Sequence, residues 1–274
     1  MWTRPIPSKW LDAWCERLAF IDPTRLTVVE IPGSATTRLQ VYPSNQATAQ
    51  KLLKHFGGSL RKIAPKDWLH RSQNREAIRI GTRFILSNNS DQAIQMKIKY
   101  PNRIVLHLPA GLAFGTGDHA TTSMILKAIS LLPNMDQQTV LDIGTGSGVL
   151  ALACRAMGSP SVEAFDYDPI STRTARENEK LNFPHGKIRW TTRDLFDWKP
   201  KLSYNLITAN LFLETLVNHS NKIISALTSG GLLFTSGLLI SQKEEAIVAF
   251  KKTGLKLLTT QKRNKWIMHT WRKR

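Results

Sequence analysis

Residues 140–148 have the sequence VLDIGTGSG, and this stretch decides the fold. The run from Val140 to Ile143 has the apolar character of a buried strand, and a helical pattern begins at Gly148. Between them, glycines alternate with small polar residues, and glycine lets a backbone turn tightly and approach a ligand closely. The spacing is G-x-G-x-G, whereas the dinucleotide fingerprint G-x-G-x-x-G needs glycine where Val149 stands. We therefore predict a strand–turn–helix unit that binds a ligand other than a dinucleotide.

Strand and helix patterns alternate after this stretch. The predicted strands are 140–143, 161–165, 188–191, 205–209 and 232–235, and the predicted helices are 148–157, 169–181, 213–227 and 242–252. Two late runs, 255–259 and 265–270, predict an antiparallel hairpin. Such alternation predicts a parallel sheet covered on both faces. Seven strands ending in a hairpin are the arrangement of the Rossmann-like class I methyltransferase domain, so we predict an α/β fold of that class.

Carboxylates follow three successive predicted strands, at Asp142, Asp166 and Asp194. Because parallel strands end at one edge of a sheet, these residues are expected to share a crevice. S-adenosylmethionine carries a sulfonium and an ammonium, which suit a carboxylate at Asp142 beside Gly144, Gly146 and Gly148. We expect Asp166 to accept hydrogen bonds from the ribose and Asp194 to contact the adenine. Asp168 is the rival of Asp166, and the alternative for it is a helix N-cap before Pro169.

Residues 1–66 predict a small N-terminal α+β domain. Helices are expected at 8–20 and 47–56, and short strands at 26–31, 39–42 and 59–63. This order resembles a ferredoxin-like domain with a lost or shortened first strand. The polar stretch 67–95 is expected to be a linker with little core of its own, and 96–274 to be the S-adenosylmethionine-dependent domain.

The composition limits the cellular setting and the partners. The chain has 274 residues and a net charge of +18, which attracts anions such as nucleic acid. Its two cysteines lie in no C-x-x-C pair, and no signal peptide or membrane span is visible. We expect a cytoplasmic protein that binds neither metal nor membrane. Nine basic residues and no acidic one lie between Lys251 and Arg274, which predicts either an RNA contact or a solvated strand edge.

Three segments carry a family resemblance. Residues 114–122 read FGTGDHATT, residues 209–211 read ANL, and residues 230–238 read GGLLFTSGL. Together with Asp67-Trp68 they resemble the ribosomal protein L-eleven methyltransferase (PrmA-like) family from about residue 67 to the end. The resemblance implies a substrate-recognition domain, a linker and a class I domain that methylates amino groups of a ribosomal protein. Asp118 and Ala120 stand where the family usually has Thr and Pro.

The resemblance also implies roles for individual residues. Phe114, Gly115, Thr116 and Thr121 would join the cofactor site, and Asn210 would contact the cofactor and orient the amine through its side-chain carbonyl. His119 and Thr122 would wall the methionine end of the cofactor and the substrate entrance. This set makes Asn210, His119 and Thr122 the candidate catalytic residues. Phe212 is expected to flank the target.

Two other functions fit the sequence. The high positive charge would suit an RNA methyltransferase, and the fold alone would suit a non-catalytic ribosome assembly factor that keeps the S-adenosylmethionine fold. Methyl label on protein rather than RNA separates the first from the leading hypothesis.

Overall fold

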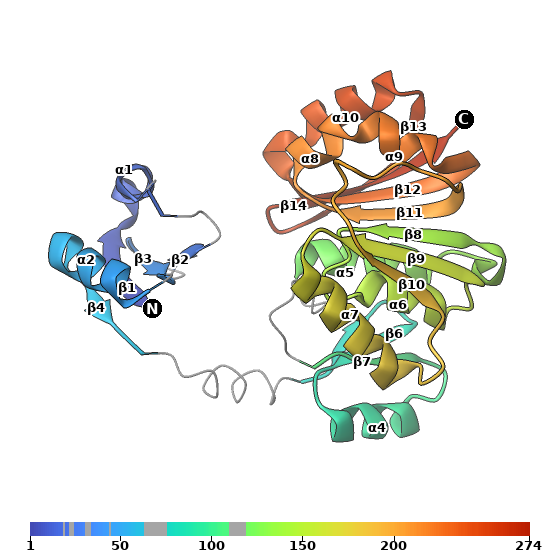
Figure 1. Ribbon diagram of the computed structural model, residues 1–274, viewed down its shortest axis with the longest axis horizontal. Helices are drawn as coiled ribbons and strands as arrows, with labels where there is room; N and C mark the ends of the chain where they lie inside the picture. The colour runs from blue at the N-terminus through green and yellow to red at the C-terminus, as the bar shows by residue number, and fades with distance from the viewer. Residues whose placement is uncertain (19, 22–24, 31–33, 44, 63–75, 110–118) are drawn as a thin grey trace. The chain divides into compact units, whose positions relative to one another are not determined.

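The computed structural model describes residues 1–18, 20–21, 25–30, 34–43, 45–62, 76–109 and 119–274. The chain divides into two compact units, Met1–His70 and Arg71–Arg274, which Figure 1 shows. Each unit has its own hydrophobic core. Within the described ranges, no helix is both long and apolar enough to cross a bilayer.

The N-terminal unit is an antiparallel sheet with two helices. Its strands β1 (Trp2–Pro7), β2 (Leu26–Glu30), β3 (Thr36–Val41) and β4 (Ser59–Leu60) lie in the order β2-β3-β1-β4. The 3-10 helix η1 (Ser8–Trp10) leads into α1 (Leu11–Arg17), and α2 (Gln46–Phe56) precedes β4. This element order is that of a complete ferredoxin-like domain. The core consists of Trp2, Ile6, Leu18, Ile21, Leu39, Val41 and Leu52.

The expectation that this domain has lost or shortened its first strand is wrong. Residues 2–7 form β1, which pairs with β3 along its whole length. Pro5 and Pro7 concealed the strand, because proline cannot donate a ladder hydrogen bond and argues against a central strand. In the described part of the chain, β4 pairs only with Trp2 and Thr3. The prolines therefore stand where one side of β1 behaves as a sheet edge, and edges tolerate proline.

Much of the predicted linker 67–95 is ordered structure with a core. Strands β5 (Ile78–Ile80), β6 (Phe84–Ser87) and β7 (Ile104–His107) form a small sheet, and helix α4 (Ser90–Lys99) packs against it. The expectation of a linker with little core is wrong for residues 78–95, whereas 67–75 lie outside the described residues. The polar stretch that suggested a linker caps a helix instead: the side chain of Asn89 accepts a hydrogen bond from the backbone N–H of Gln92 (3.0 Å).

A seven-stranded sheet forms the centre of the second unit. Its strands are β8 (Thr139–Ile143), β9 (Ser161–Asp166), β10 (Ile188–Thr192), β11 (Tyr204–Asn210), β12 (Leu227–Leu239), β13 (Leu255–Arg263) and β14 (Trp266–Lys273). They lie in the order β10-β9-β8-β11-β12-β14-β13. The first five strands run parallel, and β14 is antiparallel to both β12 and β13. The predicted sheet and terminal hairpin are confirmed.

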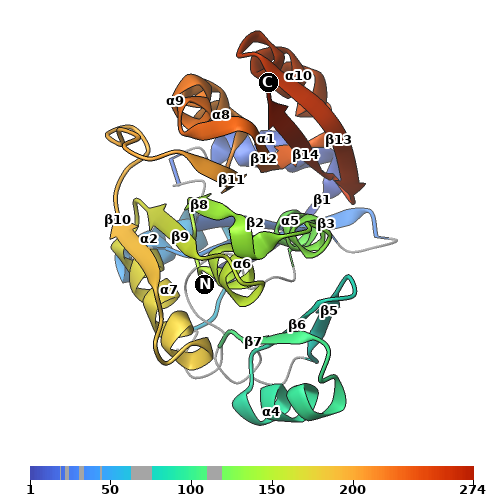
Figure 2. The same ribbon diagram turned by 90° about the vertical axis from the view of Figure 1, so that its right-hand side faces the viewer.

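Helices cover both faces of this sheet, as Figures 1 and 2 show. Helices α5 (Ala120–Ser130), α6 (Val149–Ala156) and α7 (Pro169–Asn182) contribute to the core on one face. Helices α8 (Leu213–Asn218), α9 (Ser220–Ser225) and α10 (Lys243–Lys252) contribute to the core on the other. The single helix predicted over 213–227 is interrupted at His219, and β12 already begins at Leu227. The short 3-10 turns η3 (Met135–Gln137) and η4 (Ile240–Gln242) complete the unit.

Candidate active site

The glycine turn joins β8 to α6 at the carboxyl edge of the sheet. Gly144, Gly146 and Gly148 have φ of 69°, 55° and 83°, a region that favours glycine. A Cβ at Gly148 would lie 2.8 Å from the Trp190 ring and 2.9 Å from Cβ of Ala175. The turn therefore needs glycine both for its conformation and for close packing, as the sequence predicted.

Asp142 supports this turn from below. Its side chain is buried, Oδ2 accepts a hydrogen bond from the Thr145 hydroxyl (2.6 Å), and Oδ1 accepts one from the Thr208 hydroxyl (2.6 Å). Burial raises the pKa of this carboxyl to about 6, although both hydroxyls favour the ionised form. Asp142 thus ties the glycine turn and β8 to the neighbouring strand β11.

Asp166 ends β9 beside the same turn. Its Oδ2 accepts a hydrogen bond from the backbone N–H of Gly146 (2.9 Å), and Oδ1 accepts one from that of Asp168 (3.0 Å). A carboxylate has about four acceptor positions, so capacity remains for hydroxyl groups of a ligand. The neighbouring Asp168 is the N-cap of α7, because its side chain accepts from the N–H of Ile170 (2.9 Å). The N-cap alternative for Asp168 is confirmed.

The third predicted carboxylate, Asp194, lies after β10 in an exposed turn. Its Oδ1 accepts a hydrogen bond from the backbone N–H of Phe196 (2.8 Å). Exposed aromatic rings follow each of three parallel strands here: Tyr167 is 75% exposed, Phe196 72% and Phe212 77%. The carboxyl edge of the sheet therefore presents flat apolar surfaces beside its carboxylates.

The candidate catalytic residues form one hydrogen-bonded cluster. The side-chain amide nitrogen of Asn210, at the end of β11, donates to the hydroxyls of Thr121 (3.2 Å) and Thr122 (3.3 Å) on α5. Thr121 also bonds Nδ1 of His119 (2.7 Å), the residue that directly precedes α5. Both threonines are buried. The structure thus brings Asn210 to His119, Thr121 and Thr122, although Asn210 lies 89 residues beyond Thr121 in the sequence.

Two further contacts hold the start of α5. The ring of His119 meets the ring of Trp266 edge to face at 5.1 Å, and the guanidinium of Arg263 donates to the Ser123 hydroxyl. Trp266 and Arg263 flank the turn of the β13–β14 hairpin. The terminal hairpin therefore helps to fix the start of α5 and, with it, the cluster of candidate catalytic residues.

Five residues of the FGTGDHATT motif lie outside the described residues, namely Phe114, Gly115, Thr116, Gly117 and Asp118. Their predicted roles stay predictions. Ala120 is buried as the first residue of α5. The sequence analysis missed Thr145 and Thr208 as partners of Asp142. A signal existed for Thr208, because a period of two places it on the same face of β11 as Asn210.

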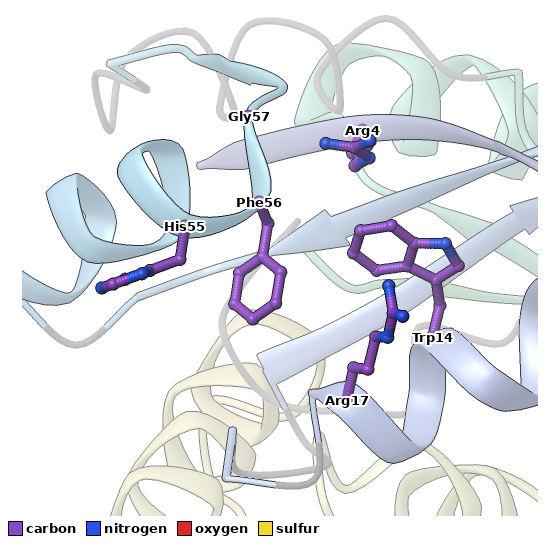
Figure 3. A pocket seen from close by; sticks show the side chains of 6 residues that line it. All are labelled: Arg4, Trp14, Arg17, His55, Phe56 and Gly57. Carbon is purple, nitrogen blue, oxygen red and sulfur yellow. The ribbon is translucent and has the colours of Figure 1, made fainter.

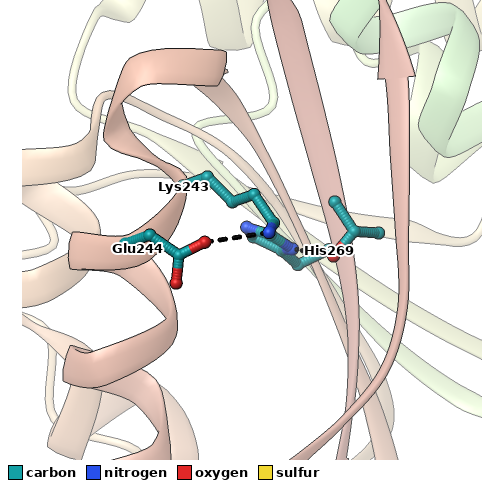
Figure 4. Close-up of polar contacts among 4 residues, drawn as sticks. Lys243, Glu244 and His269 are labelled. Atoms are coloured by element: carbon teal, nitrogen blue, oxygen red, sulfur yellow. Dashed lines mark hydrogen bonds and ion pairs between the residues drawn. The ribbon is translucent and has the colours of Figure 1, made fainter.

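One buried histidine lies outside this cluster, in β14. His269 bonds the Thr260 hydroxyl through Nδ1 (2.9 Å), and its buried Nε2 has no hydrogen-bond partner among the described residues. Figure 4 shows it beside the ion pair of Lys243 and Glu244, whose charged atoms are 2.9 Å apart. Burial, with a smaller contribution from the Lys243 charge, lowers the pKa of His269 to about 4. This histidine is neutral near pH 7.

The strand-end residues suit S-adenosylmethionine. The glycine turn carries no Cβ at residues 144, 146 and 148, so its backbone can approach a ligand closely, and Asp166 keeps acceptor capacity for ribose hydroxyls. Asn210 presents an amide whose nitrogen is already engaged. These are the hydrogen-bonding groups that a nucleoside with a cationic amino-acid tail requires.

Comparison with known proteins identifies the family. The family model described as ribosomal protein L11 methyltransferase (PrmA) matches residues 24–274. A ribosomal protein L11 methyltransferase of Chloroflexus aurantiacus is 33% identical over 234 residues, covering 76% of this chain and 69% of the relative. That of Allorhizobium ampelinum is 34% identical over 216 residues, covering 76% and 72%.

One solved structure agrees with this assignment, and a second shares the fold alone. The ribosomal protein L11 methylase of Lactobacillus delbrueckii subsp. bulgaricus has a TM-score of 0.61 and 26% identity, covering 73% of this chain and all of that one. TYW2 of P. horikoshii, in complex with MeSAdo, shares the fold at a TM-score of 0.50 and 14% identity, covering 82% of this chain and 97% of that one. The chain therefore belongs to the ribosomal protein L11 methyltransferase (PrmA) family of S-adenosylmethionine-dependent class I methyltransferases.

Proposed function

We propose that this protein methylates an amino group of ribosomal protein L11, with Asn210 as the residue that orients the amine. S-adenosylmethionine supplies an electrophilic methyl group on its sulfonium sulfur. The observation that carries the proposal is the engagement of the Asn210 amide nitrogen by Thr121 and Thr122. This contact fixes the amide so that Oδ1 remains an acceptor, and no hydrogen bond to Oδ1 is recorded from the described residues.

An amine must present its lone pair to the methyl group. A lysine side chain has a pKa near 10.4, so losing its proton near pH 7 costs about 4–5 kcal/mol. The Asn210 carbonyl would accept an N–H of the neutral amine and hold it in line with the methyl group. Positioning of this kind accelerates a bimolecular reaction without a dedicated base. His119 acts one step away, because its ring bonds Thr121 rather than Asn210.

For the cofactor we propose the following contacts. Asp166 binds the ribose hydroxyls, Asp194 contacts the adenine amino group, and Gly144, Gly146 and Gly148 line the amino-acid tail. Asp142 supports the glycine turn and acts on the ammonium through it, because both of its oxygens already accept hydroxyl protons. Phe114, Gly115, Thr116 and Thr121 complete the methionine end, with His119 and Thr122 beside the substrate entrance.

The basic C-terminal segment, residues 251–274, is proposed to contact RNA of the ribosomal particle. Two of its residues form hydrogen bonds within the unit. The Arg263 guanidinium donates to the Ser123 hydroxyl, and the Lys273 ammonium donates to the carbonyls of Ile224 (2.8 Å) and Leu227 (2.6 Å). Most of the remaining basic side chains are exposed on or beside β13, an edge strand of the sheet. A cytoplasmic location, where ribosomes assemble, follows from the proposed substrate.

A transfer assay with tritiated S-adenosylmethionine tests the function. The acceptors are purified ribosomal protein L11, large ribosomal subunits and their separated RNA, and the enzymes are the wild type, Asn210→Ala and the matched control Asn218→Ala. Asn218 is an exposed residue at the end of α8. We expect label in L11 with wild type and control. With Asn210→Ala, transfer should fall at least about a hundredfold while the cofactor still binds, since the transition state loses an oriented acceptor.

The acceptor distinguishes the competing functions. Label in RNA and none in protein would replace the proposal with RNA methylation. Cofactor binding without transfer to any acceptor would instead indicate a binding module. If Asn210→Ala and Asn218→Ala transferred label equally well, Asn210 would have no orienting role.

A further inference from the structure

A second candidate site lies in the N-terminal unit, in a surface hollow of about 660 Å³. Its lining residues are Arg4 of β1, Trp14 and Arg17 of α1, and the end of α2 with the glycine that follows it, namely His55, Phe56 and Gly57 (Figure 3). A hollow of this size falls in the range of small-molecule and nucleotide sites. None of the lining residues belongs to the methyl-transfer cluster.

Positive charge gathers in the hollow on an aromatic ring. The guanidinium carbon of Arg4 lies 4.7 Å from the centre of the Trp14 ring, and that of Arg17 lies 5.5 Å from it. Neither arginine forms an ion pair or hydrogen bond with another described residue, and no carboxylate is among the described side chains that line the hollow. Stacking on the ring orients the guanidiniums and leaves their N–H groups available for an anion.

Further aromatic rings extend from the hollow to the surface. The ring of Phe56 meets that of Trp14 at 5.8 Å edge to face, and the ring of Phe20 stacks on it at 6.2 Å. Phe20 is 65% exposed, and Trp10, beside Lys9, is 54% exposed. Within the described part of the chain, this small domain therefore combines two guanidiniums that have no anionic partner with exposed aromatic rings.

This combination selects for a particular ligand chemistry. An acidic peptide would satisfy the guanidiniums but would leave the exposed rings in water. A single-stranded nucleic acid provides both a phosphate for the arginines and an unpaired base for a ring, which is the usual way such strands are bound. We propose that this hollow binds single-stranded RNA, with phosphate against Arg4 and Arg17 and a base stacked on Phe20. The inference concerns the N-terminal unit and does not depend on the substrate of the methyl transfer.

Fluorescence anisotropy with the full-length chain tests the proposal. The probe is a fluorescein-labelled ten-nucleotide single-stranded RNA, titrated at several salt concentrations. The variants are Arg4→Gln combined with Arg17→Gln, Phe20→Ala, and the control Arg38→Gln, which removes one exposed charge from β3 outside the hollow. Circular dichroism checks that every variant is folded.

We expect the double variant to lower the log–log salt slope by about 0.7 for each arginine removed. Phe20→Ala should weaken binding at least about fivefold, as loss of one stacked base does. Arg38→Gln should leave the stacking of the base unchanged. Its effect on the affinity for RNA should be limited to the loss of one charge distant from the hollow. Because the C-terminal basic segment is intact in all variants, it cannot produce a difference between them.

Competitors of matched charge decide the ligand class. Inorganic polyphosphate that displaces the RNA as well as unlabelled RNA does would reduce the site to a generic anion site and overturn the proposal. Tighter binding of polyglutamate would point to an acidic protein partner and overturn it as well. Equal binding by the double variant and the Arg38→Gln control would place RNA binding elsewhere on the chain.

Discussion

Replacing Asp142 by Asn should make the stability of the protein respond differently to pH. The wild-type carboxylate is buried, and burial raises its pKa from 3.8 to about 6. A group whose folded-state pKa is raised stabilises the fold fully below the unfolded pKa, and this contribution is lost as the pH rises through the folded pKa. Asparagine has the shape of aspartate and carries no charge. Its side-chain oxygen can accept a hydrogen bond from one threonine hydroxyl, and its side-chain nitrogen can donate one to the other.

The magnitude follows from the size of the pKa shift. A shift of about two pKa units, each worth about 1.4 kcal/mol, means that ionised Asp142 costs the fold about 3 kcal/mol near pH 7. For a unit of this size, 1 kcal/mol corresponds to about 2–4 °C in Tm. The Tm of Asp142→Asn minus that of the wild type should therefore increase by about 6–12 °C between pH 4 and pH 7.5.

The difference between the two proteins is the quantity to measure. His269 opposes Asp142 in the same pH range, because its lowered pKa removes stability as the pH falls through 6.5 toward 4. His269 is present in both proteins, so its contribution cancels in the difference. Thermal unfolding followed by near-ultraviolet circular dichroism at half-unit pH steps gives the curve. Asp197→Asn, at an exposed carboxyl, is the matched control.

A difference curve that is flat from pH 4 to pH 7.5 would refute the reasoning, because it would mean that the buried carboxyl is not destabilised by burial. A curve that falls with rising pH would have the wrong sign. In that case the two threonine hydroxyls would stabilise the anion more than burial destabilises it.

Three further changes give measurable outcomes. Gly148→Ala should lower the Tm by several degrees and abolish cofactor binding measured by calorimetry, because φ is 83° and Cβ would lie 2.8 Å from the Trp190 ring. Glu179→Ala should cost about 1–3 kcal/mol in urea unfolding, since the side chain accepts from the Trp190 indole (2.6 Å) and the backbone N–H of Ile188 (2.9 Å), and both donors would be left without it. Thr122→Val should lower kcat about fivefold in the tritium assay, because the Asn210 amide loses one of the acceptors that orient it, while Asn218→Ala leaves kcat unchanged.

The sheet could be predicted because its signals are local. Each parallel strand is a short apolar run that ends at a polar turn, and the glycine turn after Ile143 marks where the ligand edge begins. The N-cap at Asp168 was equally local, since Pro169 follows it directly. Local signals mark the ends of an element less clearly than its presence, and the single helix predicted over 213–227 is interrupted at His219.

Two errors arose where local chemistry and tertiary context disagree. Pro5 and Pro7 argue against a strand, but the short β4 leaves one side of β1 mostly uncovered, so the prolines displace few ladder bonds. The polar residues near Asn89 argue for a linker, but they cap a helix that packs on a small buried sheet. In both cases the outcome depends on which strand or sheet lies beside the segment in the folded protein. The spacing of residues along the sequence does not reveal this neighbour.

The strand-end carboxylates show the same limit within the site. Asp142 and Asp166 look alike in sequence and both are buried, yet Asp142 bonds two threonine hydroxyls, whereas Asp166 accepts from the backbone of the glycine turn. Strand pairing explains the difference, because Asp142 stands directly opposite Thr208 of β11. Asp142 therefore lies inside the sheet, whereas Asp166 ends β9 at the carboxyl edge, where we propose that the cofactor binds.

The location of Asp142 also explains why a destabilising carboxylate is useful here. The Thr208 hydroxyl donates to Asp142, and Thr208 lies on the same face of β11 as Asn210 two residues later. One hydrogen bond therefore couples the glycine turn to the strand that carries the proposed amine-orienting residue. An ionised acceptor makes shorter and stronger hydrogen bonds than a neutral one, so Asp142 holds this coupling more rigidly than asparagine can. The more stable Asp142→Asn protein should therefore be the slower enzyme, with methyl transfer reduced more than cofactor affinity. A variant that gained stability without losing kcat would show that the buried carboxylate has no positioning role.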